Sequence, residues 1–198
     1  MNGFIGRRNI CLVYVYLFVV GTYMISDMYI QIRQERPVDY QQIRELVRNA
    51  FALAEHSDGE EHNLIERMRL SPEYIPELSL VAVSGDIILG HIMFSKISVG
   101  QSEAIALAPI SVRTDWQRKG IGKLLVTTGH KQARKMGYRC SMVLGNPDYY
   151  SKFGYERASS YGIIAPFDVP DEYYMVCDLG NTGDLPKGYV RYSDAFEL

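Results

Sequence analysis

The segment of this sequence with the clearest chemical potential is a glycine-containing turn at residues 115–123, Asp-Trp-Gln-Arg-Lys-Gly-Ile-Gly-Lys. Gly120 and Gly122 leave the backbone amides accessible, and the helix predicted to follow directs the positive end of its dipole at the turn. Such a turn binds a phosphate or pyrophosphate without a dedicated cation. Further positive charge comes from Arg118, Lys119 and Lys123. The spacing therefore predicts a site for a phosphorylated ligand.

Three kinds of phosphate-binding turn can be tested against these residues. A Walker A loop needs a glycine where Gln117 stands and a serine or threonine where Leu124 stands, so it is excluded. A dinucleotide fingerprint needs a third glycine at the position of Leu125, so it is excluded as well. The pattern that fits is Gln-x-x-Gly-x-Gly at residues 117–122. A glycine-rich helix start without any ligand is the alternative.

The elements that must position this turn are predicted from hydrophobic periodicity. Residues 121–136 place apolar side chains on one face of a helix that ends at Gly137, which suits a left-handed cap. Residues 103–112 predict a strand, but Pro109 cannot donate to the ladder, so we expect the strand to bulge or part from a neighbour there. A buried strand is predicted at residues 139–144, followed by a short helix at 147–152 that begins with proline.

The remaining segments predict further helices and strands. Asp39 and Gln42 have the spacing of a capping box at the start of a helix. The other predicted elements are helices over residues 39–54 and 61–70, a hairpin of strands 78–83 and 87–99, and short strands near 28–33, 155–158 and 174–179. Hairpins mixed with crossovers indicate an α+β class with a mixed sheet.

Composition excludes several function classes. The chain has 198 residues, which suits one domain, and its formal net charge of −2 supplies no basic field for a nucleic acid. Its three cysteines, Cys11, Cys140 and Cys177, form no CxxC pair, which argues against a disulfide scaffold and favours a reducing cytoplasm. The histidines include no His-Glu-x-x-His motif, so neither a zinc hydrolase nor any other metal site is predicted.

The N-terminal residues form an apolar extension that we predict to lie outside the main domain. Residues 9–25 hold no charge and follow Arg7 and Arg8, the outline of a signal peptide or a short membrane anchor. The run is at the lower limit of the length that spans a bilayer. We therefore favour a spurious extension, with the true start at Met24 or Met28, or a loosely attached helix. The predicted division is an extension at 1–27 and a domain at 28–198.

In the turn at residues 117–122 and its flanking segments, the sequence resembles the GNAT superfamily of N-acyltransferases. The pattern at residues 117–122 is that of the superfamily's acyl-CoA pyrophosphate loop, and residues 106–112 resemble its splayed fourth strand. Residues 143–155 resemble its fifth strand, short helix and Tyr-x-x-x-Gly-Phe ending, with Tyr155 in place of the usual phenylalanine. The C-terminal part of the sequence resembles that of one bacterial branch of small, mostly uncharacterised GNAT proteins. The resemblance implies a mixed, mostly antiparallel sheet with a splayed fourth and fifth strand pair and flanking helices.

The resemblance also implies acetyl-CoA as co-substrate, with no metal. Strand residues would pair with the pantetheine arm, and the turn would hold the pyrophosphate. The implied cofactor-binding residues are Ile110, Ser111, Val112, Gln117, Arg118, Lys119, Gly120, Ile121, Gly122, Lys123, Asn146 and Tyr150.

Direct acyl transfer needs a donor for the thioester oxygen, a route for the amine proton and an acid near the leaving sulfur. Tyr150 falls on the tyrosine of the family pattern and is the implied acid; packing over the cofactor, or a role for Tyr149 instead, is the alternative. Oxyanion donors are expected from the backbone near residues 110–112. For the general base we choose Glu61 from the group Glu60, Glu61 and His62, although the better explanation of that group is polar residues at a helix start, where the dipole favours the two carboxylates. Asp148 is a weaker candidate, and a water chain could replace any single base.

The resulting hypothesis is a cytoplasmic acetyl-CoA-dependent N-acetyltransferase, an acyltransferase transferring groups other than aminoacyl, that acts on a primary amine of a small molecule or protein. The alternatives are an acyl-CoA-binding sensor without turnover and, if residues 9–25 insert, a membrane-tethered transferase. The amine acceptor and a homodimeric state are left open.

Other reactive residues have ordinary structural explanations. His91 is expected in the core or at an edge with a hydrogen bond, whereas His56 and His130 are expected at the surface. Cys140 and Cys177 are expected to be small buried side chains. A tyrosine cluster could line an acceptor pocket, with packing as the default explanation: Tyr161, Tyr173 and Tyr174.

Overall fold

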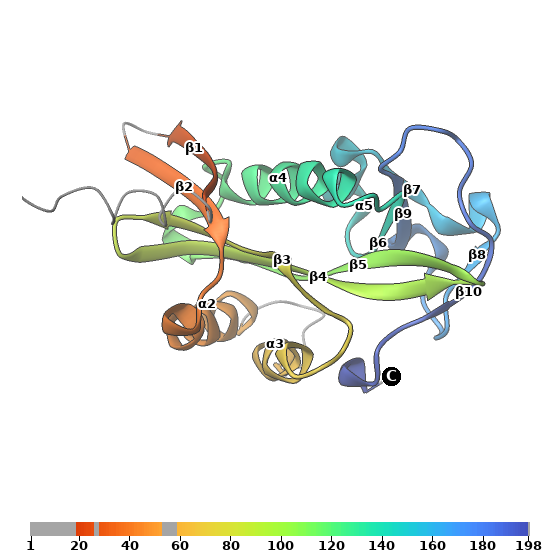
Figure 1. Ribbon diagram of the computed structural model, residues 1–198, viewed down its shortest axis with the longest axis horizontal. Helices are drawn as coiled ribbons and strands as arrows, with labels where there is room; N and C mark the ends of the chain where they lie inside the picture. Colours follow the sequence, from red (N-terminus) through yellow and green to blue (C-terminus); the bar gives the residue numbers. More distant parts are fainter. Residues whose placement is uncertain (1–18, 26–27, 53–58, 198) are drawn as a thin grey trace, which may run out of the picture.

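The computed structural model describes residues 19–25, 28–52 and 59–197, which fold around one twisted sheet (Figure 1). The ten strands are β1 (Val19–Ile25), β2 (Met28–Gln34), β3 (Tyr74–Ser84), β4 (Ile87–Val99), β5 (Ser102–Val112), β6 (Cys140–Leu144), β7 (Tyr155–Arg157), β8 (Ile163–Ile164), β9 (Tyr174–Asp178) and β10 (Gly188–Arg191). The main path is β1-β2-β3-β4-β5-β6-β9-β7, and β10 pairs with β4 and β8. Neighbours are antiparallel except β5–β6 and β8–β10, so the predicted mixed α+β class is confirmed.

The main helices lie on both faces of the sheet. Figure 1 shows α4 (Ile121–Lys135) across one face and α2 (Tyr40–Phe51) with α3 (Glu61–Arg69) on the other. The short helix α5 (Pro147–Tyr150) follows β6. This arrangement brings the start of α4, α5 and the ends of β5 and β6 to one side of the molecule.

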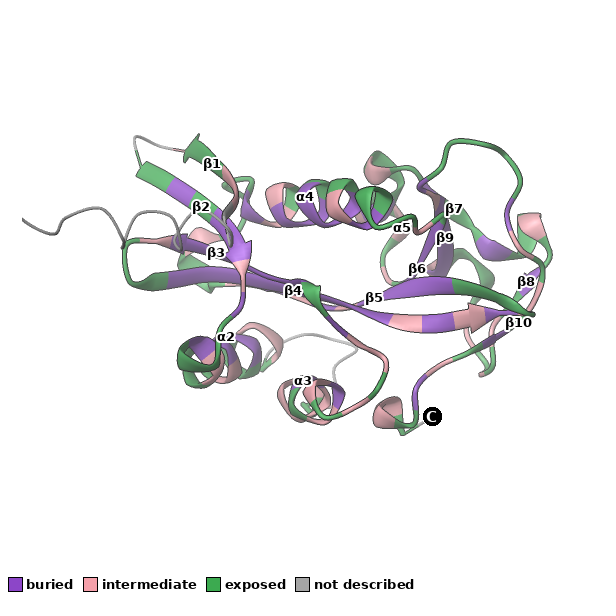
Figure 2. Ribbon diagram, viewed as in Figure 1, coloured by how far each residue is buried: buried purple, intermediate pink, exposed green. Residues whose placement is uncertain are grey.

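Apolar side chains fill the space between these layers, and Figure 2 shows the central strands as the most buried part. Ile121 and Leu125 of α4 are buried against the sheet, and Gly90 of β4 permits this close approach, because a Cβ there would lie 3.0 Å from both side chains. On the other face Ile43 and Val47 of α2 belong to a second apolar cluster. The predicted amphipathic stripes are therefore present in both helices.

The central hairpins follow the predicted turns. β3 and β4 are joined at Gly85, whose φ of 57° suits a residue without a side chain. The register between β4 and β5 shifts between Ile92 and Phe94, close to Pro109 in the facing strand. The predicted disturbance of the ladder at Pro109 is confirmed.

The predicted capping box at Asp39 and Gln42 is wrong. No described side chain caps α2 at Asp39; its carboxylate instead accepts two hydrogen bonds from Arg33 and one from the backbone N–H of Arg36. Gln42 lies over the β3–β4 turn, where Ile88 N–H donates to its Oε1 at 3.4 Å. The bond to Arg33 is bidentate and joins two full charges, whereas a cap would join the carboxylate to one uncharged backbone N–H, and only the fold brings Arg33 within reach.

Residues 19–25, taken from sequence as part of an apolar extension, form strand β1 rather than a helix. β1 pairs antiparallel with β2, and Tyr23 hydroxyl lies 3.3 Å from Thr128 Oγ1 on α4. Residues 1–18, and with them most of the uncharged run, lie outside the described residues. Across the parts of the chain that are described, no helix combines the length and the hydropathy needed to cross a membrane.

Candidate active site

Strands β5 and β6 part from one another after a short pairing. Their parallel ladder holds only at Ile105 with Ser141 and at Ala106 with Met142, and no described strand pairs with the β6-facing edge of β5 beyond that point. The backbone from residue 107 to 112 therefore has hydrogen-bonding groups free for a ligand on that edge. Ile110 lines the resulting opening, whereas Ser111 is buried and its Oγ lacks a hydrogen-bond partner among the described residues.

The turn at residues 117–122 connects β5 to α4 with two residues in the left-handed region. Arg118 has a φ of 59° and Gly120, the residue before the helix, a φ of 92°. Gln117 Nε2 donates to the carbonyl of Val112 at 3.3 Å, which holds the turn against the end of β5. No described side chain caps α4, so the amides of its first turn are available to an anion.

Three cations surround this turn without carboxylate partners among the described residues: Arg118, Lys119 and Lys123. All three are exposed, and the Nζ of Lys119 lies 4.6 Å above the ring of Trp116. The nearby Arg113 differs, because it forms a bidentate pair with Asp115. Ile121 contributes only backbone here, since its side chain is in the core.

The two glycines of the turn serve different purposes. A Cβ on Gly120 would meet nothing within 4 Å, so this position requires glycine for its backbone conformation and leaves open space above the amides. A Cβ on Gly122 would lie 2.5 Å from the hydroxyl of Tyr149. Gly122 therefore makes room for α5 to dock on the start of α4.

Tyr150 is held at the mouth of the β5–β6 opening by its neighbours. Its ring lies edge-on to those of Tyr149 and Tyr155, with centroid distances of 5.0 and 5.6 Å, and against Gly145, where a Cβ would collide with it. Asn146 fixes the start of α5, since its Oδ1 accepts from the N–H of Asp148 at 2.8 Å.

The Tyr150 hydroxyl is not hydrogen-bonded to any described residue, although the side chain is almost completely buried. Burial raises the pKa of Tyr150 well above that of an ordinary phenol, and the neighbouring Tyr149 adds to the effect. The hydroxyl consequently keeps its proton across the neutral range and is suited to donate a hydrogen bond.

A cleft of about 390 Å³ runs from the β5–β6 opening towards α3. Both predicted catalytic residues line it, Tyr150 on one side and Glu61, the first residue of α3, on the other. Glu61 has no ion-pair or hydrogen-bond partner among the described residues. Glu60, His62 and Asp148 do not line the cleft.

Sequence reasoning missed the apolar side of the cleft. Its lining includes residues from the end of α2, from α3, from the loop between β8 and β9 and from the C-terminal segment: Phe51, Leu64, Phe167, Tyr192 and Phe196. Their wide separation in sequence leaves no local signal. None of Tyr161, Tyr173 and Tyr174 lines the cleft; Tyr174 instead packs behind it, with its hydroxyl 3.0 Å from that of Tyr192.

The histidine expectations have mixed outcomes. His91 is fully buried and hydrogen-bonded, as predicted, whereas the prediction of a surface position for His130 is wrong. His130 Nε2 lies 3.0 Å from the Tyr155 hydroxyl, and burial, reinforced by Arg134, lowers the pKa of His130 to about 4. Helical spacing alone did not reveal that the His130 ring lies between Phe94 of β4 and Tyr155 of β7. His56 lies outside the described residues.

The two described cysteines follow the prediction. Cys140 and Cys177 are free and buried, and burial raises the pKa of each thiol to about 11. Neither is a candidate nucleophile at neutral pH.

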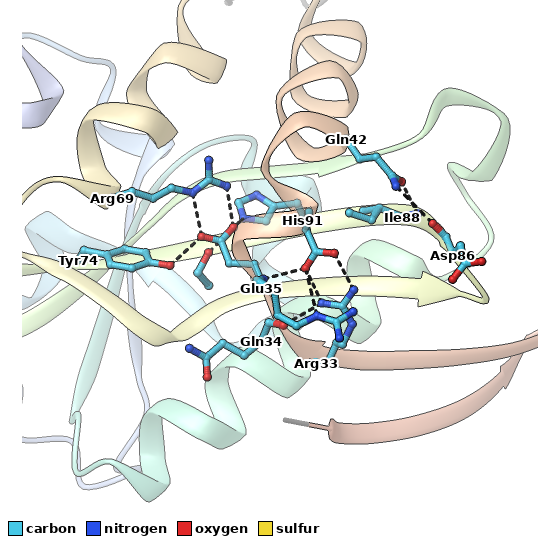
Figure 3. A network of polar contacts seen from close by, with 12 residues as sticks. Arg33, Gln34, Glu35, Gln42, Arg69, Tyr74, Asp86, Ile88 and His91 are labelled. Atoms are coloured by element: carbon cyan, nitrogen blue, oxygen red, sulfur yellow. Dashed lines mark hydrogen bonds and ion pairs between the residues drawn. The ribbon is translucent and has the colours of Figure 1, made fainter. Parts of the chain in front are cut away.

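A second polar cluster lies under α3 and takes no part in the cleft (Figure 3). Glu35 is buried and accepts two hydrogen bonds from Arg69, at 2.9 and 2.8 Å, and one from the hydroxyl of Tyr74 at 2.7 Å. His91 Nε2 lies 3.1 Å from Glu35 Oε2 and 3.2 Å from Ser79 Oγ. Burial alone would raise the pKa of Glu35, but the bonds and charges of Arg69 and His91 outweigh it and hold that pKa far below its usual range.

The parting strands, the uncapped helix start and the tyrosine at the cleft can be compared with known proteins. The family model of the GNAT acetyltransferases matches residues 40–155. The chain belongs to the GNAT acetyltransferase family. Among curated relatives of this GNAT protein, the uncharacterised N-acetyltransferase YjhQ of Escherichia coli strain K12 is 30% identical over 167 residues, 80% of this chain and 90% of that one. The uncharacterised N-acetyltransferase YhbS of the same strain is 30% identical over 172 residues, 83% and 97% of the two chains.

Solved structures agree with this assignment. A GNAT family acetyltransferase from Brucella melitensis, in complex with acetyl-CoA, is 32% identical and superposes with a TM-score of 0.71 over 84% of this GNAT chain and 97% of its own. The fold is also that of YhbS from Escherichia coli in complex with CoA, with a TM-score of 0.79 over 89% and 96% of the two chains at 24% identity. The sequence-based resemblance and its fold are thus confirmed.

Proposed function

We propose that this GNAT protein transfers the acetyl group of acetyl-CoA directly to a primary amine. The observation that carries the proposal is the junction of an unpaired strand edge, residues 107–112 of β5, with an uncapped helix start surrounded by three unpaired cations. The strand edge suits the amide groups of a pantetheine arm, and the helix start suits a pyrophosphate. The acetyl-CoA complex of the Brucella relative supports the same co-substrate.

In this proposal the cofactor runs along β5 and ends at α4. Backbone groups of Ile110, Ser111 and Val112 pair with the pantetheine arm and face the thioester oxygen. The pyrophosphate lies on the amides of residues 120–123, and the side chains of Arg118, Lys119 and Lys123 add attraction that salt would screen. Gln117 acts by fixing the turn to Val112, and Asn146 by capping α5.

The proposed chemistry uses Tyr150 on one side of the cleft and Glu61 on the other. The amine nitrogen attacks the thioester carbon, the C–N bond forms, the C–S bond breaks, and the electron pair leaves on sulfur. Of the two protons lost by the ammonium nitrogen, Glu61 takes one, directly or through water, and the other ends on the CoA sulfur. Tyr150 donates a hydrogen bond to that sulfur as its charge develops. Tyr150 and Glu61 are the proposed catalytic residues.

The second candidate function is an acyl-CoA sensor that binds without turnover. The lack of a hydrogen-bond or ion-pair partner for Glu61 among the described residues favours it, because no described side chain holds this carboxylate in place as a base. Thiol release from acetyl-CoA in the presence of amines distinguishes the two functions, since a sensor binds acetyl-CoA without accelerating that release.

A pair of glycine variants tests the cofactor site. Gly120 and Gly137 lie at opposite ends of α4, with φ of 92° and 91°, and a Cβ at either meets nothing within 4 Å. Gly120→Ala and Gly137→Ala therefore carry the same backbone strain, and we expect similar losses of about 1 kcal/mol in unfolding free energy. Only Gly120→Ala is expected to weaken acetyl-CoA binding, by tenfold or more in calorimetric titration of the full chain. Equal affinities in the two variants would contradict the placement of the pyrophosphate.

The proposal includes three further predictions from sequence. These are a transferase domain over residues 28–198 with a separate extension at 1–27, a cytoplasmic location, and a homodimeric state. Cell fractionation and size-exclusion chromatography of the full chain test the last two. Because β1 pairs with β2, removal of residues 1–27 is expected to expose a new sheet edge, and its effect on the melting temperature tests the first.

A further inference from the structure

The side of the cleft that faces Tyr150 is an apolar wall formed by Phe51, Leu64, Phe167, Tyr192 and Phe196. Its rings contact one another: Tyr192 and Phe196 at a centroid distance of 4.9 Å, and Phe167 and Tyr192 at 6.1 Å. The hydroxyl of Tyr192 is already hydrogen-bonded to that of Tyr174. A molecule in the cleft therefore meets hydrocarbon and ring surface on this side.

The apolar wall is fixed in place by the C-terminal segment, which lies beside α3 (Figure 1). Arg67 of α3 donates from Nε to the carbonyl of Ala195 at 2.9 Å and pairs with Glu197 at 3.3 Å. Ser193 donates to Glu73 at 2.9 Å and caps the turn that carries Phe196. These bonds preform the wall before any acceptor enters.

Glu61 is the single charged side chain among the described residues that line the cleft. It has no ion-pair partner among them, and none of these described lining residues is a lysine or an arginine. An acceptor ammonium can thus be paired with Glu61. A carboxylate on the same molecule would be removed from water without a partner, which is costly.

Resting on the proposed function, we propose that the acceptor is a primary monoamine carried on an uncharged, apolar body such as an aryl or branched alkyl group. Its ammonium pairs with Glu61 and its body packs on the apolar wall, with the nitrogen between Glu61 and the thioester. Free amino acids are excluded by their carboxylate, and polyamines are disfavoured because a second ammonium finds no second carboxylate among the described residues of the lining.

Thiol release from acetyl-CoA by the full-length protein tests this with amines of matched shape. The probes are 2-phenylethylamine, L-phenylalanine amide, L-phenylalanine, spermidine, ethylamine and a peptide with a free lysine side chain. We expect kcat/KM for 2-phenylethylamine and for the amide to exceed that for L-phenylalanine by at least tenfold, and that for 2-phenylethylamine to exceed the value for spermidine.

Variants separate the ammonium contact from the apolar contact. Glu61→Gln is expected to raise KM for 2-phenylethylamine by tenfold or more, whereas Glu66→Gln, an exposed carboxylate on the same helix, leaves KM within twofold. Phe196→Ala is expected to lower kcat/KM for 2-phenylethylamine by about tenfold more than kcat/KM for ethylamine, which has little apolar surface to place on the wall. A folding defect would lower both, and Phe167→Leu provides an independent test of the same contact.

Calorimetric titration with acetyl-CoA separates failure of this inference from failure of the proposed function. Absence of acetyl-CoA binding by the folded protein overturns both. Binding with faster turnover of spermidine, L-phenylalanine or the lysine peptide overturns the monoamine assignment and leaves the transferase intact. Binding without turnover of any amine overturns the assignment and supports the sensor function.

Discussion

Two polar regions on opposite sides of the sheet differ in whether their charged side chains are paired. Under α3, both oxygens of Glu35 are hydrogen-bonded, and its charge is balanced by Arg69 (Figure 3). At the start of α4, Arg118 and Lys123 have no carboxylate partner among the described residues, and the helix has no side-chain cap. The first region is buried and the second exposed.

This difference has a physical cause. A buried charge must be paired because the loss of hydration is otherwise not compensated, so the Glu35 cluster holds its elements together. Exposed cations remain hydrated, so they can stay unpaired until a ligand binds, at little cost in folding free energy. Substitutions in the Glu35 cluster should therefore change stability, and those around the cleft should change binding and turnover.

The largest expected effect is that of Arg69→Met. The substitution leaves Glu35 buried without its main counter-charge, which costs about 3–5 kcal/mol of unfolding free energy. For a chain of this size that lowers the melting temperature by roughly 10 °C. The matched change Arg118→Met is expected to leave the melting temperature within about 2 °C and to weaken acetyl-CoA binding. Thermal unfolding measures the melting temperatures, and calorimetric titration measures acetyl-CoA binding. An Arg69→Met protein as stable as the parent would contradict the difference that we infer between the two regions.

The pH dependence of stability sharpens the comparison. His130 is buried without a counter-charge, and its pKa of about 4 lies below the ordinary value of 6.5. Between these values the unfolded chain binds more protons, so stability falls as the pH drops from 6.5 to 4, by about 3 kcal/mol. His130→Gln is expected to flatten this slope in urea titrations across that range.

Glu35 acts in a separate, more acidic window. Because its pKa is held below the ordinary 4.5, its stabilising contribution is complete above that pH and is lost as the pH falls further. A Glu35-dependent loss should therefore remain in His130→Gln below pH 4.5. An unchanged slope between pH 6.5 and 4 in that variant would show that His130 is not the responsible group.

The smallest expected effects on stability come from deleting single tyrosine hydroxyls. Tyr74→Phe removes a donor to the Glu35 carboxylate and is expected to cost about 1.5–3 kcal/mol of unfolding free energy. Tyr150→Phe removes a hydroxyl that bonds to no described residue, so stability should change by less than about 0.5 kcal/mol. Its kcat should fall about 100-fold with acetyl-CoA affinity unchanged.

Tyr149→Phe is the control for the active-site hydroxyl. It removes a neighbouring phenol from the same short helix, and turnover should be affected less than in Tyr150→Phe. The reverse order in steady-state kinetics would assign the role to Tyr149, and unchanged turnover in both would make these tyrosines packing residues.

The structure of the proposed cofactor side could be predicted from sequence far better than that of the proposed acceptor side. The turn at 117–122, the helix after it and the break at Pro109 are signalled by consecutive residues, because glycine and proline act on the local backbone. Glu61 could be named only as one of several polar residues at a helix start. Phe167 and Phe196 carried no signal, since they reach the cleft through long-range packing.

The errors have the same origin. Asp39 has the spacing of a cap, but the fold brings Arg33 to it. His130 lies on a helix with a mixed face, but its ring is buried and hydrogen-bonded to Tyr155 of β7. In both cases a partner distant in sequence or on another element displaced the local expectation.

The sequence by itself determined the family, the mixed sheet and the glycine turn before α4, because these depend on periodicity and on residues within a few positions of one another. Tertiary structure alone decided which charges are paired, that Tyr150 and Glu61 share one cleft, and that an apolar wall faces them. Those features depend on contacts between segments up to about 145 residues apart, such as Phe51 and Phe196, and only the packed sheet brings such segments together.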